Sequence, residues 1–187
     1  MTANSNKRSA KKPKARKKLS AHVTKLEMDH PPLRSLPVPT RPTIALMRAR
    51  NISAEFYSFM YELVGKAYHW ENRRSRPPAE LFAIINEDNC EIHVLYADGC
   101  PAGFFELDTA DLPEKVEILY FGLAADYQGL GLGKWFLSAA ISAAWAHKPE
   151  RVTVETNTLD HPAALPLYQR LGFSPVGVDD VKITPWD

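Results

Sequence analysis

The sequence predicts an α/β fold of the α+β class, in which strands and helices follow one another through one domain. The strongest observation lies between Lys115 and His147, where an apolar run passes through a glycine-rich turn into an amphipathic helix. A second is a pair of strand-like runs that meet at Asp98-Gly99, a two-residue hairpin signal. The length of 187 residues and the apolar content of 45% suit one domain with a full hydrophobic core.

The first 41 residues differ in composition from the rest. Residues 1–20 carry eight Lys or Arg and no acid, a charge of +8, which leaves −7 on the remainder of a chain with a net charge of +1. Abundant Lys, Ser, Ala and Pro predict a disordered basic tail and a Pro-rich linker over residues 1–41, followed by the folded domain over residues 42–187. The tail is interpreted as a solvated extension, as sequence upstream of a true start near Met28, or as a nucleic-acid tether, and residues 29–42 as a linker or an arm lying over the domain.

The folded domain is expected to begin with a strand at Ile44–Met47 and a helix capped by Ser53. A 3.6-residue period predicts the inward face of that helix as Phe56, Phe59, Met60, Leu63, Val64 and Ala67. Pro77-Pro78 then opens a short helix through Ile85. The remaining strands are predicted at Glu91–Ala97, Cys100–Asp108, Val116–Phe121, Arg151–Thr156 and Val181–Thr184.

The glycine-rich turn runs from Gln128 to Lys134 and leads into a helix from about Leu132 to His147. The first-turn N–H groups of a helix lack intrahelical partners, and its dipole is positive at that end. A strand, a glycine loop and a helix N-terminus therefore predict an anion site with phosphate as the obvious guest, although a plain strand-to-helix turn is the alternative.

The glycine spacing excludes two familiar phosphate loops. A P-loop has four residues between its first Gly and the Gly-Lys pair and then Ser or Thr, whereas three residues separate Gly129 from Gly133, and Trp135 follows Lys134. The dinucleotide fingerprint Gly-x-Gly-x-x-Gly is one residue longer than the spacing here. The remaining pattern, Gln-x-x-Gly-x-Gly, resembles motif A of the GNAT superfamily of acetyl-CoA-dependent N-acetyltransferases, in which the loop amides hold the pyrophosphate of coenzyme A.

A second match lies downstream, where Ala164 to Phe173 resembles the family's Ala-x-x-Leu-Tyr-x-x-x-Gly-Phe, a helix beside the pantetheine. The resemblance covers residues 42–184. It implies the GNAT fold, a mixed, mostly antiparallel central sheet flanked by helices on both faces. It also implies acetyl-CoA as cosubstrate, held by Leu123, Gln128, Gly129, Leu130, Gly131, Gly133, Lys134, His161 and Tyr168.

The same resemblance implies the chemical roles. Glu117 matches the strand carboxylate that acts as base, directly or through water; a sheet-surface carboxylate is the alternative, and Glu106 is the reserve base. Tyr168 matches the tyrosine that protonates the leaving thiolate, and the backbone N–H of Leu123 polarises the acetyl carbonyl. His161 departs from the pattern, because the family commonly has Asn there, and its imidazole either replaces that hydrogen bond or caps the following helix.

The implied function is an N-acetyltransferase that moves an acetyl group from acetyl-CoA to a primary amine of a small molecule or protein, by direct attack in a ternary complex. The alternative is a non-catalytic acyl-CoA-binding sensor or scaffold module. By resemblance, Tyr68 to Arg74 border the acceptor pocket; an ordinary loop is the other interpretation.

Other partners are constrained by composition. Six scattered histidines, together with Cys90 and Cys100, give no metal-ligand spacing, so no metal is expected. No apolar run reaches the length of a membrane helix, and the low cysteine content suits a cytoplasmic protein. Nucleic acid is expected only through the basic tail, and a homodimer is compatible with the sequence.

Overall fold

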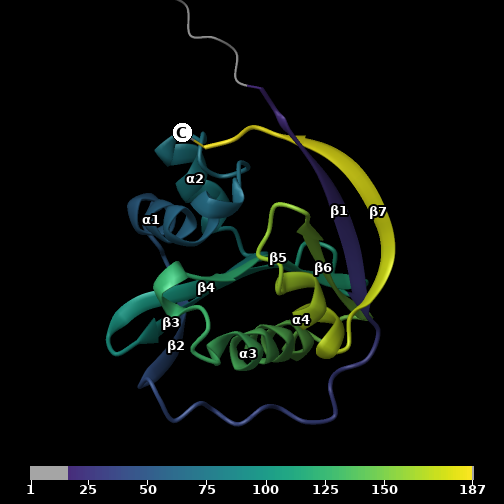
Figure 1. Cartoon of the computed structure of the whole chain (residues 1–187). Coiled ribbons are helices and arrows are strands. Elements are labelled where there is room, and N and C mark those ends of the chain that lie inside the picture. The colour runs from purple at the N-terminus through teal and green to yellow at the C-terminus, as the bar shows by residue number, and fades with distance from the viewer. Residues whose placement is uncertain (1–16, 187) are drawn as a thin grey trace, which may run out of the picture.

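A seven-stranded sheet organises residues 17–186, the part of the chain that the computed structural model describes (Figure 1). The strand order is β2-β3-β4-β5-β6-β1-β7, and every neighbouring pair is antiparallel except β5 and β6. The strands are β1 (Leu19–Met28), β2 (Ile44–Ala49), β3 (Cys90–Ala97), β4 (Cys100–Asp108), β5 (Lys115–Leu123), β6 (Arg151–Asn157) and β7 (Ser174–Ile183). The predicted mixed, mostly antiparallel sheet is therefore confirmed.

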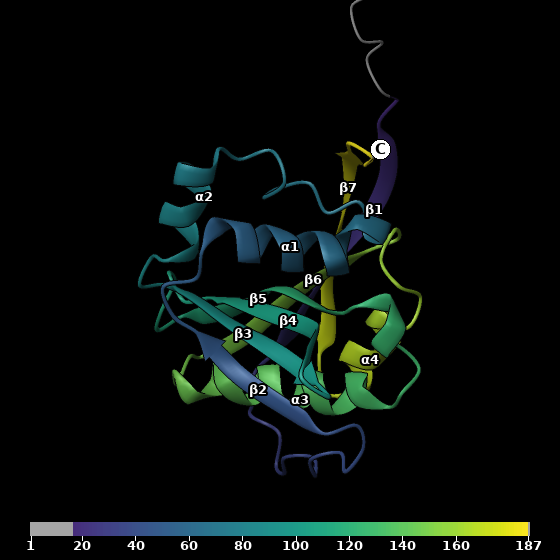
Figure 2. The same cartoon turned by 90° about the vertical axis from the view of Figure 1, so that its left-hand side faces the viewer.

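Helices cover both faces of this sheet, also as predicted (Figure 2). Helices α1 (Ala54–Gly65) and α2 (Pro78–Ile85) lie on one face, and α3 (Leu132–Ala146) and α4 (Ala164–Arg170) lie on the other. Two short 3-10 helices, η1 (Lys66–Tyr68) and η2 (Ala125–Tyr127), follow α1 and β5. Each face has its own cluster of buried apolar side chains, so the sheet separates two hydrophobic cores.

Strand β1 lies where the sequence analysis placed part of the tail. It pairs with β6 on one side and β7 on the other, and Leu26 and Met28 are almost fully buried. The prediction of a disordered tail is therefore wrong for Leu19–Met28. Residues 1–16 of that predicted tail lie outside the described residues, and residues 29–43 run without helix or strand from β1 to β2, as an extended linker does (Figure 1).

Helix α1 begins as predicted but turns a different face inward. The Ser53 hydroxyl accepts a hydrogen bond from the backbone N–H of Phe56 at 3.2 Å, which confirms the cap. Tyr57 and Tyr61 are buried, whereas Phe59 is 51% and Leu63 38% exposed. A tyrosine can be buried at low cost when its hydroxyl finds a partner, and the Tyr57 hydroxyl donates to Glu106 in the core.

The predicted hairpin is present, and the last strand is longer than predicted. Asp98 and Gly99 both have positive φ angles, 49° and 84°, as the two central residues of a type I′ turn require. Strand β7 is longer than the predicted Val181–Thr184, because it follows β1 over almost its whole length. Among the described helices, none is long and apolar enough to cross a membrane.

Candidate active site

The parallel strands β5 and β6 separate part-way along their length. They pair only from Lys115 opposite Arg151 to Ile118 opposite Val154. Immediately afterwards Leu119 forms a bulge against β4, since Ile118 pairs with one β4 residue and Tyr120 with the next. Beyond this point a pocket of about 480 Å³ opens between the two strands.

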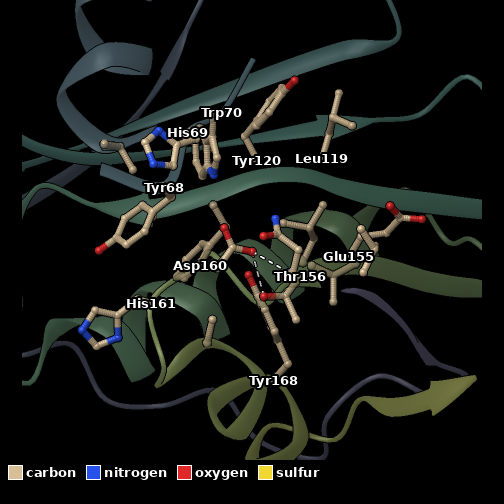
Figure 3. Close-up of a pocket in the computed structure, with 18 of the residues that line it drawn as sticks. Tyr68, His69, Trp70, Leu119, Tyr120, Glu155, Thr156, Asp160, His161 and Tyr168 are labelled. Atoms are coloured by element: carbon tan, nitrogen blue, oxygen red, sulfur yellow. Dashed lines mark hydrogen bonds between the residues drawn. The ribbon is translucent and has the colours of Figure 1, made fainter. Parts of the chain in front are cut away.

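The pocket has two walls built from distant parts of the chain (Figure 3). Tyr68, His69 and Trp70, which follow α1, form one wall together with Leu119 and Tyr120 of β5. The facing wall comes from the end of β6, the turn after it and α4. Its labelled members are Glu155, Thr156, Asp160, His161 and Tyr168.

The backbone of Leu123 faces the open side of β5. The N–H of Ala124 donates to the carbonyl of Ala102 at 2.9 Å, and Leu123 is the register partner of Gly103. In an antiparallel ladder this bond makes Leu123 and Gly103 a non-hydrogen-bonded pair, so the N–H and C=O of Leu123 point away from β4. The N–H is thus available at the edge where β6 has diverged.

The glycine loop leads directly from this edge into α3. Gly129 and Gly131 have φ angles of 76° and 79°, which side chains rarely adopt, and a Cβ at either would meet open space. Gly131 is the N-cap of α3, no side chain caps the helix, and its first turn contains no acid. The free first-turn N–H groups therefore face solvent without a competing anion, which suits a phosphate group.

The predicted loop residues divide into two groups. Gln128, Gly129 and Gly133 line the pocket, whereas Leu130, Gly131 and Lys134 are exposed and do not line it. The Gln128 side chain makes hydrogen bonds within the protein. Its amide nitrogen lies 3.0 Å from the Leu123 carbonyl and 3.0 Å from the Tyr68 hydroxyl. Gln128 thus joins the end of β5, the loop and the segment after α1, a role that its motif position alone does not reveal.

Glu117 lines the pocket at the point where the strands part. Burial raises the pKa of its carboxyl above the ordinary value, Lys115 opposes that shift, and the like charge of Glu155 adds to it. The Lys115 ammonium is 3.9 Å from Glu117 but closer, at 3.3 Å, to Asp111. A carboxyl with a raised pKa and a weak ion pair is a better proton acceptor than an ordinary surface glutamate.

Glu106, the reserve base, lies elsewhere. Its side chain is 1% exposed and does not line the pocket. One oxygen accepts a hydrogen bond from the Tyr57 hydroxyl at 2.5 Å, and the other lies 2.7 Å from the Arg73 guanidinium. These contacts assign Glu106 a structural position beneath the segment that contains Arg73.

Tyr168 rises from α4 toward Asp160 and Thr156 (Figure 3). Its ring packs against Phe121 and Phe173. Burial raises the pKa of the phenol well above its ordinary value, and the nearby Asp160 carboxylate raises it further. The phenol therefore stays protonated near neutral pH, but the raised pKa also makes it a weaker acid than a solvent-exposed tyrosine.

His161 borders the pocket and is exposed. Its Nδ1 accepts a hydrogen bond from the backbone N–H of Ala163 at 3.1 Å, so the ring stabilises the turn that precedes α4. The ring also meets the edge of Tyr68 across the pocket mouth. The capping interpretation is wrong, because α4 begins at Ala164 with Ala163 as its N-cap and no side chain caps it. The His161 Nε2 points away from the bond to Ala163.

Sequence reasoning missed the C-terminal contribution to the site. The N–H of Thr184 donates to Glu71, and the Trp186 indole donates to the Trp70 carbonyl at 2.7 Å. Arg74 lies over the Trp186 ring and donates to the Thr184 carbonyl. These contacts fasten the segment after β7 to the wall after α1. No motif marks them, because they depend on the path of β7.

Metal binding has no support in this site. Within residues 17–186, no group of three or more His, Cys, Asp or Glu side chains is arranged to hold a metal ion.

The chain is similar to a known protein family in sequence and to solved structures in fold. The model of the acetyltransferase (GNAT) family matches residues 56–173, more than half of the chain. No curated protein sequence matches significantly. Among solved structures, a GCN5-related N-acetyltransferase from Kribbella flavida has a TM-score of 0.60 at 18% identity, covering 87% of this chain and 58% of its own.

Two other structures show the same fold. A tandem GNAT protein from the clavulanic acid biosynthesis pathway has a TM-score of 0.61 at 18% identity, covering 92% of this chain and 56% of its own. An aminoglycoside acetyltransferase from an uncultured soil metagenomic sample has a TM-score of 0.56 at 16% identity, covering 68% of this chain and 86% of its own. The chain thus spans less than three fifths of the first two structures.

Proposed function

Because the chain belongs to the GNAT family of acetyltransferases, we propose that it transfers an acetyl group from acetyl-CoA to a primary amine, by direct attack in a ternary complex. The observation that carries this proposal is the outward-facing N–H of Leu123 at the end of β5, five residues beyond the last residue of β5 that pairs with β6. It lies one short loop before the uncapped N-terminus of α3. A thioester carbonyl and a pyrophosphate would find donors at these two places.

The residues present suit acetyl-CoA. The glycine loop offers N–H groups and open space to the phosphates, and the gap between β5 and β6 offers unpaired backbone groups to the pantetheine amides. When bound, acetyl-CoA supplies the activated acetyl group. The Leu123 N–H then stabilises the negative charge that develops on the carbonyl oxygen.

In this mechanism Glu117 accepts a proton and Tyr168 donates one. Alkyl amines have a pKa of about 10, so most are protonated near neutral pH, and the ammonium must first lose one proton to solvent to expose the nitrogen lone pair. Glu117, which lines the pocket, then takes a second proton, directly or through water, as the neutral nitrogen attacks the carbonyl carbon. As the new C–N bond forms, the C–S bond breaks and the thiolate takes the proton of Tyr168. Glu117 finishes protonated and Tyr168 ionised, and exchange with solvent resets both groups.

A thiol-release assay tests this function directly. Full-length protein, acetyl-CoA and a panel of amines, amino acids and peptides should give release of coenzyme A together with an acetylated product detected by mass spectrometry. Binding of acetyl-CoA with no turnover of any amine would instead favour the alternative, an acyl-CoA-binding sensor or scaffold.

A further inference from the structure

The lining of the pocket contains more carboxylates than cationic side chains. Four carboxylates line it, and a single lysine faces them. They are Glu71, Glu117, Glu155 and Asp160, with Lys182 as the lysine. The Lys182 ammonium is already held by the Ser20 hydroxyl. Such a surface attracts cations and repels anionic acceptors.

The partners of these carboxylates show which of them is free for a ligand. Glu71 accepts the N–H of Thr184, and Asp160 accepts both the Thr156 hydroxyl and the N–H of Asn157 at 2.8 Å. Glu155 is exposed and, among the described residues, no hydrogen bond or ion pair of its carboxylate is recorded. Lys25, the register partner of Glu155 on β1, interacts with it electrostatically but forms its ion pair, at 2.6 Å, with Asp179.

Glu117 and Glu155 share one face of the sheet. Glu117 is the register partner of Thr153 on β6, and Glu155 lies two residues further along the same strand. Strand spacing and rise then put their Cα atoms on the order of 8 Å apart. The charge of Glu155 also acts on Glu117, whose pKa it helps to raise.

We propose that the acceptor is a small amine with at least two ammonium groups, such as an alkyl diamine or polyamine, and that Glu155 is the residue that selects it. This inference rests on the proposed acetyl transfer. The reacting nitrogen sits at Glu117, while a second ammonium a few carbon atoms away pairs with Glu155. Trp70, whose ring faces the pocket in Figure 3, offers an aromatic surface to the connecting carbon chain and its charge.

A matched pair of substrates tests the proposal. In 1,5-diaminopentane and hexylamine, chains of equal length end in an ammonium or a methyl group. Full-length protein with saturating acetyl-CoA should show a kcat/KM for the diamine at least about tenfold higher, as expected when a hydrogen bond to a charged group is gained. The advantage should shrink as salt is added, because screening weakens charge pairing.

Variants assign the effect to one side chain. Glu155→Gln should reduce the ratio of kcat/KM for diamine over monoamine by about tenfold. Glu87→Gln, at an exposed carboxylate outside the pocket, should leave that ratio unchanged. Equal or better use of hexylamine by the wild type would overturn the polycation proposal while leaving acetyl transfer intact. An unchanged ratio in Glu155→Gln would overturn the role of Glu155. Absence of turnover with every amine would instead count against the proposed function itself.

Discussion

Arg73 and Glu106 form an ion pair, with 2.7 Å between Nη2 and Oε1, that ties the segment after α1 to the centre of β4. Both side chains are largely removed from solvent, with 13% and 1% exposure. Removal of one partner of a buried pair leaves the other charge uncompensated. The pair therefore fixes the segment that contains Tyr68 to Trp70. It also leaves Glu106, the reserve base of the sequence analysis, engaged with Arg73.

Replacement of this carboxylate should change stability more than chemistry. We expect Glu106→Gln to lower the free energy of unfolding by about 2 kcal/mol, the value of a hydrogen bond to a charged group. For a chain of this size that corresponds to roughly 4–8 °C in Tm. Turnover should stay within about threefold of wild type. Glu91→Gln is the matched control, because Glu91 is also a buried, paired carboxylate and lies outside the pocket. A hundredfold loss of turnover at unchanged Tm would return Glu106 to the role of base.

Truncation should separate the N-terminal strand from the residues before it. Removal of residues 1–28 deletes β1, which leaves β7 without a neighbouring strand and β6 with β5 alone, and we expect an insoluble or unfolded product. Removal of residues 1–16 keeps β1 and is expected to preserve Tm and turnover. Thermal melting and gel filtration of the two truncated proteins check this. A folded protein without residues 1–28 would show that the sheet tolerates loss of β1.

Sequence patterns identified most elements because their signals are local. Ser53, the turn at Asp98-Gly99 and the glycine loop each impose a particular backbone geometry within a few residues. Strand β1 was missed for two physical reasons. It adjoins a dense basic run, and its apolar alternation changes phase at the register shift between Lys25 and Leu26, so no single period of two spans it.

The site was predictable only where a motif specified it. The resemblance to family motifs pointed to Glu117, Tyr168 and the glycine loop, and both side chains line the pocket. Glu155 and Trp186 could not, because their positions in the site depend on the divergence of β5 from β6 and on the path of β7. Such tertiary contacts leave no periodic signal in the sequence.

The glycine loop yields a prediction about cosubstrate affinity. Gly131→Asp introduces a side chain at a φ of 79° and a negative charge at the N-terminus of α3, so we expect at least a tenfold rise in the Kd for coenzyme A. Gly99→Asp, with a φ of 84° in the β3–β4 turn, imposes a similar strain outside the loop and away from the N-terminus of α3. Calorimetry on both variants separates backbone strain from anion binding. Equal affinities in the two variants would remove the loop from the phosphate site.

The environment of Glu117 predicts linked changes in activity and stability. If Glu117 is the base, Glu117→Gln should reduce turnover by about 10²- to 10⁴-fold. Because its pKa is raised in the folded protein, the charged form opposes folding; this carboxyl stabilises the fold below its unfolded pKa, and that contribution is lost as pH rises through the folded pKa. Glu117→Gln should therefore melt at a higher temperature than wild type at pH 7.

The pH profile provides an independent measurement of the same group. On the acid side of the profile, kcat/KM should begin to fall at a pH above the ordinary pKa of a glutamate, since Glu117 must be deprotonated to act and its pKa is raised. Glu155→Gln removes a like charge and should shift that fall to lower pH. If the acid side of the kcat/KM profile is the same in Glu117→Gln and Glu155→Gln as in the wild type, the group that titrates there is not Glu117.

Tyr168 offers the sharpest distinction between a catalytic and a structural role. Tyr168→Phe keeps the ring and its packing against Phe121 and Phe173 but removes the proton. If the phenol protonates the leaving thiolate, turnover should fall by roughly 10²- to 10⁴-fold with little change in the Kd for coenzyme A. Within residues 17–186, no hydrogen bond to the Tyr168 hydroxyl is recorded, so its loss should cost little stability.

Tyr96→Phe, at a partly buried tyrosine of β3 outside the pocket, is the matched control for this substitution. The raised pKa of Tyr168 adds a second readout, because a phenol that must be protonated keeps kcat constant up to high pH. Turnover and Tm should be measured for both variants with saturating acetyl-CoA and the best amine. If Tyr168→Phe turns over within threefold of wild type, the thiolate takes its proton from another source. Tyr168 would then serve as a packed wall of the thioester channel, a role that its burial between Phe121 and Phe173 also supports.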